Sequence, residues 1–210
     1  MTAYIVLNGE ETPGLADILK NKEHIYCADG GANILFKHAI VPTVIVGDLD
    51  SINDEAKEFY QSKGCKFLTV KAEKDEIDGE LIADRAVADG AKNIVLLCAL
   101  GKRLDHTLGN IQVLCRVAEK GISAVAFGNG TKVFVDTSKI EIEKNDGEFV
   151  SLIPFSDETE VALTGFGYSG ESIVLSRTKT LGISNYVVDE KGIITVKKGL
   201  PIVIVESKKR

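Results

Sequence analysis

The sequence lacks the features that tie a protein to a membrane or to nucleic acid. No stretch is long or apolar enough to cross a bilayer, and the apolar start 3–7 has no basic flank, so we expect neither a membrane anchor nor a signal peptide. The formal net charge is -6, and the only basic run is 208–210. Because general nucleic-acid binding requires clustered Lys and Arg, this charge balance argues against a nucleic-acid partner.

Cysteine is scarce, and its positions are far apart. The four cysteines are Cys27, Cys65, Cys98 and Cys115. This spacing matches neither a zinc site nor a disulfide framework, and Cys27 and Cys98 lie in apolar, strand-like runs. We therefore expect reduced thiols in a cytoplasmic protein.

What the sequence does contain, up to about residue 128, is a regular alternation of two patterns. Short apolar runs predict strands at 3–7, 25–28, 43–46, 66–70, 93–99 and 123–127. Apolar residues at helical spacing predict helices at 15–22, 32–38, 54–63, 78–89 and 107–120. This order predicts an α/β fold, a mostly parallel sheet with helices on both faces.

The pattern changes after residue 127. Short segments rich in Val and Ile follow, without a helical pattern between them, at 132–135, 148–154, 160–164, 173–175, 186–188, 193–196 and 202–205. They predict a C-terminal all-β sandwich. With the turn signal Asn129-Gly130 as the joint, we expect two domains, 1–130 and 131–210.

Polar residues follow the first five predicted strands. In an open parallel sheet, ligands bind beyond the carboxyl ends of the strands, so these segments should share one edge. The segments are Asn8-Gly9, 29–33, 47–51, 71–78 and 100–106.

The segment 47–51 places Asp48 and Asp50 two positions apart at a strand end. Paired carboxylates there can hold a divalent cation and the phosphates bound to it. Taken alone, the segment is equally typical of a helix entry, with Ser51 as the helix cap.

The segment 29–33 carries Gly30 and Gly31 at a predicted strand-to-helix turn. Exposed backbone N–H groups at such a turn can hold a phosphate. The segment matches neither the Walker A nor the dinucleotide pattern, and a tight turn that requires glycine is the alternative.

Two further segments combine carboxylates with basic residues. Lys74 and Asp75 precede Asp78 at a helix start, where capping is the alternative to metal binding. Arg103 precedes Asp105 at the next helix start, so Arg103 can fork onto phosphate oxygens while Asp105 faces a metal. The alternative is that Asp105 only caps the helix and His106 packs within it.

Together, the predicted edge holds six carboxylates: Asp29, Asp48, Asp50, Asp75, Asp78 and Asp105. So many like charges repel one another unless cations lie among them. Magnesium with a polyphosphate supplies such cations, because Mg²⁺ takes oxygens from one or two acids and from phosphates. The chemistry indicates an enzyme that uses a nucleoside triphosphate.

These segments resemble the thiamine pyrophosphokinase (thiamine diphosphokinase) family. The similar pieces, in chain order, are 28–33, 47–51, Lys74-Asp75 with Asp78 and Glu80, 101–106 with Asn110, and 183–185. The resemblance implies an N-terminal nucleotide-binding catalytic domain and a C-terminal β-sandwich that binds thiamine. It also implies a homodimer with thiamine sites between subunits, and transfer of the pyrophosphoryl group of ATP to thiamine with Mg²⁺, giving thiamine diphosphate and AMP.

On this resemblance we assign residue roles as hypotheses. The catalytic set is Asp48, Asp50, Asp75, Asp78, Arg103 and Asp105, and its first four members are the metal ligands. The nucleotide set is Asp29, Gly30, Gly31, Asn33, Lys74, His106 and Asn110. Ser184 and Asn185 are the candidate thiamine contacts.

The chain departs from the family pattern at three points. Lys102 stands where a glycine is usual, and Ile77 where a threonine is usual. The chain also has no Trp to pack on thiamine, which leaves open whether Tyr168 or Tyr186 does so.

Two alternatives remain from the residues. Asp48 and Asp50 alone also fit a DxD site of a sugar-nucleotide transferase or a phosphohydrolase. The changes at Lys102 and Ile77 fit a non-catalytic sensor of nucleotide or thiamine.

Overall fold

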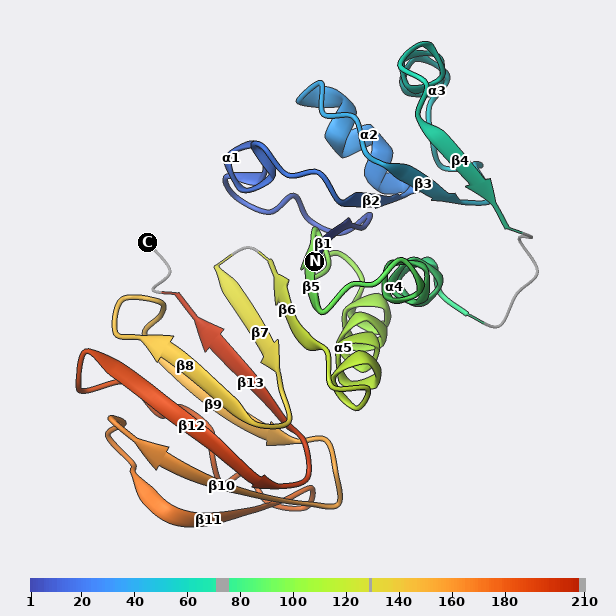
Figure 1. Cartoon of the computed structure of the whole chain (residues 1–210). Coiled ribbons are helices and arrows are strands. Elements are labelled where there is room, and N and C mark those ends of the chain that lie inside the picture. Colours follow the sequence, from blue (N-terminus) through green and yellow to red (C-terminus); the bar gives the residue numbers. More distant parts are fainter. Residues whose placement is uncertain (71–75, 129, 208–210) are drawn as a thin grey trace. The chain divides into compact units, whose positions relative to one another are not determined.

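The computed structural model describes residues 1–70, 76–128 and 130–207, and it divides into two compact units. The first unit is Met1–Val113 with Ala126–Asn129, and the second is Leu114–Val125 with Gly130–Arg210. Figure 1 shows the helices and strands of both units. The predicted domains 1–130 and 131–210 differ from these units in that the second unit also takes a piece of the chain before residue 126.

The first unit contains a parallel sheet with strand order β4-β3-β2-β1-β5. The strands are β1 Thr2–Val6, β2 Ile25–Ala28, β3 Val44–Gly47, β4 Lys66–Thr69 and β5 Asn93–Leu97. The central strands β2 and β3 are buried at every residue, because helices cover both faces. In the register, Cys27 lies beside Ile45, and Ala28 lies beside Val46. The carboxyl ends of β2 and β3 therefore coincide.

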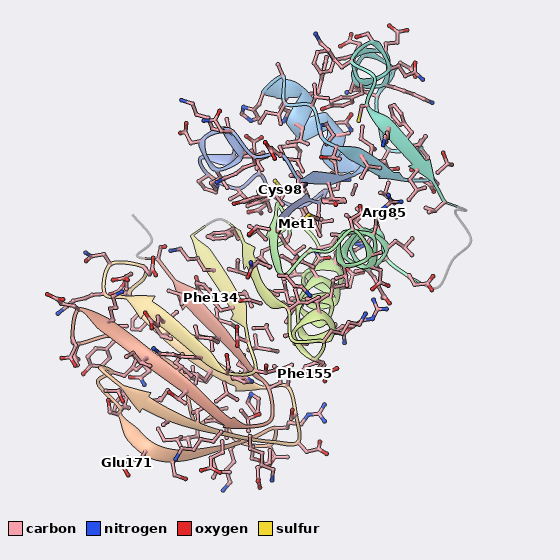
Figure 2. All side chains as sticks on the ribbon, viewed as in Figure 1. Met1, Arg85, Cys98, Phe134, Phe155 and Glu171 are labelled. Atoms are coloured by element: carbon pink, nitrogen blue, oxygen red, sulfur yellow. The ribbon has the colours of Figure 1, made fainter. Side chains whose placement is uncertain are left out.

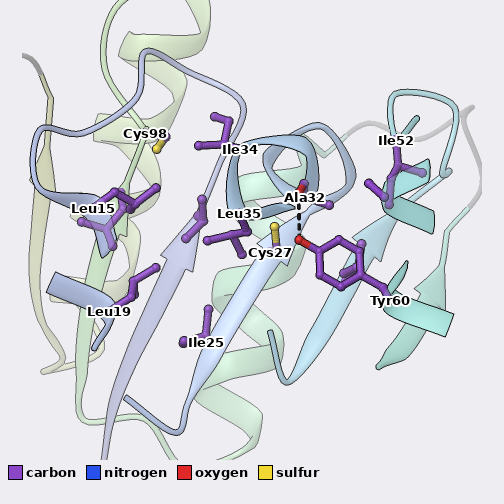
Figure 3. Close-up of a cluster of buried hydrophobic side chains, with 14 residues drawn as sticks. Leu15, Leu19, Ile25, Cys27, Ala32, Ile34, Leu35, Ile52, Tyr60 and Cys98 are labelled. Atoms are coloured by element: carbon purple, nitrogen blue, oxygen red, sulfur yellow. Dashed lines mark hydrogen bonds between the residues drawn. The ribbon is translucent and has the colours of Figure 1, made fainter. Parts of the chain in front are cut away.

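The helices of the first unit lie on both faces of this sheet. They are α1 Leu15–Leu19, α2 Asp29–Lys37, α3 Asp54–Ser62 and α4 Asp78–Ala88, followed by α5 Leu104–Ala118, which ends in the second unit. The helices α1, α2 and α3 contribute to one buried cluster, in which Tyr60 donates a hydrogen bond of 2.9 Å to the carbonyl of Ala32 (Figure 3). Figure 1 shows α4 on the opposite side of the strands from α2.

The second unit is built mainly from antiparallel strands. They are β6 Ser123–Phe127, whose last residues belong to the first unit, β7 Thr131–Val135, β8 Lys139–Glu143, β9 Phe149–Pro154, β10 Glu158–Thr164, β11 Gly170–Ser176, β12 Lys191–Lys198 and β13 Pro201–Glu206. The order β7-β13-β9 forms one antiparallel array, and β11-β10-β12-β8 forms a four-stranded sheet. Buried aliphatic residues of both sheets form one core, with Phe134 of β7 packed against it (Figure 2). The predicted fold class is confirmed.

Local predictions differ from the structure at four places. The predicted strand 186–188 is wrong, since only isolated bridges such as Phe166 to Val187 occur there. The strand β8 was missed, although its charged residues alternate with two buried isoleucines in the pattern of a half-buried strand. The helix α2 begins at Asp29 rather than after a loop, and the cap of α3 is Asn53 rather than Ser51.

All four cysteines are free thiols. Burial raises the pKa of the Cys27 thiol well above its usual value, which keeps the thiol protonated. Within the described part of the chain, no helix combines the length and the apolar character needed to span a membrane.

Candidate active site

A cavity of about 370 Å³ lies at the carboxyl edge of the parallel sheet in the first unit. It is lined by residues that follow β1, β2, β3 and β5 and by the start of α4: Leu7, Asn8, Gly9, Ala28, Asp29, Ser51, Ile77, Asp78, Gly79, Ala99, Gly101, Lys102, Arg103, His106 and Asn110. The structure thus brings the polar segments of the sequence to one place, as the positions of the strand ends predict.

Three carboxylates converge beside this cavity. One oxygen each of Asp29, Asp48 and Asp50 lies within 4.8 Å of the others. Asp29 is buried at 4% exposure, Asp48 is half-buried and Asp50 is exposed. The group is therefore open toward solvent on one side, and carboxylate oxygens at this spacing suit a hard divalent cation.

The backbone of 47–49 is shaped around Asp29. A Cβ atom on Gly47 would lie 2.8 Å from the Asp29 carboxyl carbon, so a side chain at position 47 would displace this carboxylate. Leu49 has a φ of 67°, in the left-handed region, and its N–H donates a 3.1 Å hydrogen bond to Asp29 Oδ2. That conformation costs roughly 1 kcal/mol for a residue other than glycine. The strained residue, Leu49, therefore lies between Asp48 and Asp50.

The pKa of Asp29 is raised above its usual range. Burial is the main cause, and the negative charge of Asp78 and a hydrogen bond with Asp48 add to it. The N–H groups of Gly30 and Ser51 act in the opposite direction. Burial and the acidic neighbours therefore disfavour the charged form of Asp29, and a bound cation would stabilise that form.

The residues that follow Asp29 are helical, so the predicted glycine turn is the first turn of α2. Gly30 and Gly31 lie in the first turn of α2, where Cβ atoms would overlap the Asn8 side chain and the Val6 carbonyl. Glycine is required because α2 approaches β1 closely. The side chain of Asn33 connects α2 to the segment 51–53. Its Nδ2 donates to the Ser51 carbonyl at 2.7 Å, and its Oδ1 accepts from the Asn53 N–H at 2.9 Å.

Arg103 and Asp105 form a pair at the start of α5. The guanidinium donates two hydrogen bonds to the Asp105 carboxylate, of 3.1 Å and 2.6 Å, and both side chains are exposed. These bonds and the His106 N–H lower the pKa of Asp105 to about 2. Arg103 and His106 line the cavity, whereas Asp105 is neither among the lining residues nor in the group of three carboxylates.

The remaining predicted residues of the first unit lie at the same edge or outside the described residues. Asp78 is the first residue of α4 and lines the cavity. Asn110 is buried, and its Nδ2 donates to the Ala99 carbonyl at 2.7 Å. Lys102 has a φ of 54°, and its ammonium donates to the Asn8 carbonyl at 3.1 Å. Lys74 and Asp75 lie outside the described residues.

The predicted thiamine contacts lie in the second unit. Ser184 has a φ of 59°, and its N–H donates to Ser151 Oγ at 3.0 Å. Asn185 is 3% exposed, and its side-chain amide bonds to the backbone of Tyr168 and Tyr186. The rings of these two tyrosines form an edge-to-face pair with centroids 6.2 Å apart.

Known proteins match this chain over most of its length. The model of the thiamin pyrophosphokinase catalytic domain matches residues 15–126, and that of the thiamin pyrophosphokinase vitamin B1 binding domain matches 137–201. The chain belongs to the thiamine pyrophosphokinase family. The resemblance predicted from the motifs is confirmed, and neither the DxD alternative nor the sensor alternative is favoured.

Individual relatives agree with this assignment. A thiamine pyrophosphokinase of Bacillus subtilis is 31% identical over 180 residues, which cover 84% of each chain. Thiamine pyrophosphokinase 1 of rice is 30% identical and covers 92% of this chain and 83% of its own. The crystal structure of the Bacillus subtilis protein superposes with a TM-score of 0.89 at 27% identity, over 100% of both chains.

The structure places one residue of the predicted nucleotide set beside two of the predicted metal ligands. Asp29 was assigned to the nucleotide set, yet it completes the group with Asp48 and Asp50. The signal was present in the sequence, because Asp29 directly follows the strand that neighbours β3 in a parallel sheet.

Proposed function

We propose that this chain transfers the pyrophosphoryl group of ATP to the hydroxyl of thiamine, giving thiamine diphosphate and AMP. Membership of the thiamine pyrophosphokinase family supports this reaction. At the site, the observation that carries the proposal is the convergence of Asp29, Asp48 and Asp50 beside a cavity that Arg103 also lines.

Mg²⁺ fits the carboxylates of this edge. Asp29, Asp48 and Asp50 offer three oxygens within 4.8 Å of one another, and Asp78, with Asp75, is a further ligand candidate. These residues would hold Mg²⁺, which supplies positive charge to the phosphates of ATP.

The protein's own residues bind and orient the reactants. The thiamine oxygen forms a bond to the β-phosphorus, the bond from that phosphorus to the α-β bridging oxygen breaks, and AMP leaves with this oxygen. A carboxylate of the cavity accepts the hydroxyl proton. Such a transfer depends on positioning and on balancing the charge of the phosphates.

Basic residues would stabilise that charge. Arg103 lines the cavity, and its guanidinium would release the Asp105 carboxylate and bind phosphate oxygens of ATP instead. Lys74 would also bind these oxygens. The first turn of α2 with Gly30 and Gly31, together with His106, is assigned to the nucleotide. Asn33 and Asn110 would support this site by holding its backbone segments.

The remaining parts of the proposal concern organisation. We assign nucleotide binding and catalysis to residues 1–130 and thiamine binding to 131–210. The active form is proposed to be a cytoplasmic homodimer with thiamine sites between subunits.

Product analysis tests the reaction. The protein is incubated with ATP, Mg²⁺ and thiamine, and nucleotides and thiamine phosphates are separated. We expect AMP and thiamine diphosphate in equal amounts. Release of ADP or inorganic phosphate without thiamine would instead indicate a phosphohydrolase, and binding of both ligands without turnover would indicate a sensor.

A further inference from the structure

Thr12 is a buried polar residue in the loop between β1 and α1, with 3% of its surface exposed. Its Oγ1 accepts a hydrogen bond of 2.8 Å from the N–H of Cys98 and donates one of 3.3 Å to the carbonyl of Phe127. All three residues belong to the first unit. One hydroxyl group therefore connects the loop after β1 to the ends of β5 and β6.

The backbone of Cys98 departs from the conformation of a strand. Cys98 follows the last residue of β5 and has a φ of 53°, in the left-handed region that disfavours residues with a side chain. Its side chain is fully buried in the hydrophobic cluster of the first unit (Figure 3). A strained residue keeps its conformation only when its surroundings hold it there.

The loop after β1 holds Cys98 at both of its backbone polar groups. Thr12 accepts from its N–H, and the N–H of Gly9 donates to its carbonyl at 2.7 Å. A Cβ atom on Gly9 would lie 2.3 Å from that carbonyl oxygen, so the close approach requires glycine at position 9. The strained conformation of Cys98 is thus fixed by contacts from a distant part of the chain.

The segment 99–103, which follows Cys98, contributes to the candidate active site. Four of its residues line the cavity: Ala99, Gly101, Lys102 and Arg103. The same loop after β1 also contacts this segment, because the N–H of Glu10 donates to the Leu100 carbonyl at 3.3 Å. The direction in which the chain leaves Cys98 therefore determines where the segment 99–103 lies.

We infer that Thr12 is a positioning residue for ATP: its hydroxyl holds Cys98 in the left-handed conformation and thereby places the segment 99–103 at the cavity. This inference rests on the proposed function for the identity of the ligand. Without the hydroxyl, the buried N–H of Cys98 would lose its acceptor, and a methyl group cannot approach that nitrogen as closely as 2.8 Å. The backbone would move and carry the cavity residues with it, which weakens binding.

ATP binding without turnover tests this inference. Isothermal titration calorimetry with ATP and Mg²⁺, in the absence of thiamine, compares the wild-type chain with two variants of Thr12. Thr12→Val keeps the shape of the side chain but has no hydroxyl, and it should raise the Kd for ATP about tenfold. Thr12→Ser keeps the hydroxyl and should stay within about twofold of the wild-type Kd. A wild-type Kd in Thr12→Val, or an equal loss in both variants, would overturn the inference.

Thr159→Val is the matched control for the loss of a buried hydroxyl. Thr159 is fully buried in the second unit, and its Oγ1 donates to the Leu200 carbonyl at 3.4 Å. The variant loses this hydrogen bond and should leave the Kd for ATP unchanged. A loss of ATP affinity as large as that in Thr12→Val would show that general destabilisation is the cause, and it would overturn the inference.

Steady-state kinetics separate positioning from damage to the whole active site. In Thr12→Val, the KM for ATP should rise about tenfold while the KM for thiamine changes less than about twofold. Equal changes in the two constants would contradict a role directed at ATP.

Gly9→Ala keeps the test decisive if Thr12→Val does not fold. Its methyl group should displace the Cys98 carbonyl while Thr12 is intact, so the Kd for ATP should rise, and an unchanged Kd would contradict the inference. The two proposals fail separately. ATP affinity that depends on Thr12 without AMP formation by the wild-type chain sinks only the proposed reaction, and AMP formation with unchanged ATP affinity in the variants sinks only this inference.

Discussion

The carboxylate group of the first unit and the tyrosine pair of the second unit are held in place by different kinds of hydrogen bond. In the first unit, backbone N–H groups bond to Asp29, three carboxylates converge, and burial with acidic neighbours raises the pKa of Asp29. In the second unit, the neutral amide of Asn185 is used on the backbone, and the exposed groups are rings. The comparison shows that charged side chains dominate the first group, whereas backbone hydrogen bonds and a ring contact define the second.

The largest expected effect is at Asp48. Asp48→Asn removes one negative oxygen from the converging group and should lower AMP formation by about 100-fold or more, because charge balance at the phosphates is the main catalytic contribution. Asp54→Asn in the first turn of α3 is the control, since Asp54 is exposed and lies outside the group. Near-normal turnover of a folded Asp48→Asn protein would refute the metal-site assignment.

Removing the metal should abolish activity at the carboxylate group of the first unit and leave the tyrosine pair of the second unit unaffected. With EDTA, AMP formation should stop and return when Mg²⁺ is restored, because the carboxylates need a cation to accept a polyphosphate. Thiamine-dependent quenching of tyrosine fluorescence should persist in EDTA. Loss of quenching together with activity would contradict the claim that the two regions act independently.

A smaller effect is expected at Arg103. Arg103→Lys replaces the bidentate guanidinium with a single ammonium group, and it should raise the KM for ATP about tenfold without changing the KM for thiamine. Asp105→Asn should cost less than about threefold in turnover, because Asp105 acts through Arg103. A loss in Asp105→Asn as large as that in Asp48→Asn would show that Asp105 takes part in catalysis directly.

The smallest effect is expected at Lys102, whose φ of 54° favours glycine. Lys102→Gly should raise the free energy of unfolding by up to about 1 kcal/mol, because glycine adopts this backbone conformation without strain. Thermal and urea unfolding measure the change. A less stable variant would show that the hydrogen bond from Lys102 to the Asn8 carbonyl outweighs the backbone strain.

The secondary structure was predictable where a strand or helix is buried on one face or on both faces. The short apolar runs of β2 and β3 predicted these strands, because parallel strands covered on both faces are continuously apolar. The strand β8 was missed although Lys and Glu alternate with Ile140 and Ile142 in the pattern of a half-buried strand. At 186–188 an apolar segment forms only isolated bridges, because tertiary pairing decides the outcome there and local composition does not encode it.

The candidate site was predictable in its location and less so in its contacts. Strand ends in a parallel sheet fixed the edge, and the motifs there named most cavity residues. The close approach of Gly47 to Asp29, which brings Asp29 to Asp48 and Asp50, depends on packing between α2 and β3. The hydrogen bonds of the Asn185 amide to Tyr168 were not predictable for the same reason, since Tyr168 is 17 residues away in the chain.

One measurement tests the central claim most directly. ATP labelled at the β-phosphate is incubated with the protein, Mg²⁺ and thiamine, and the products are separated. Transfer of the pyrophosphoryl group predicts label in thiamine diphosphate and an equal amount of unlabelled AMP. Label that stays in ADP, with thiamine monophosphate or free phosphate as the other product, would contradict the account.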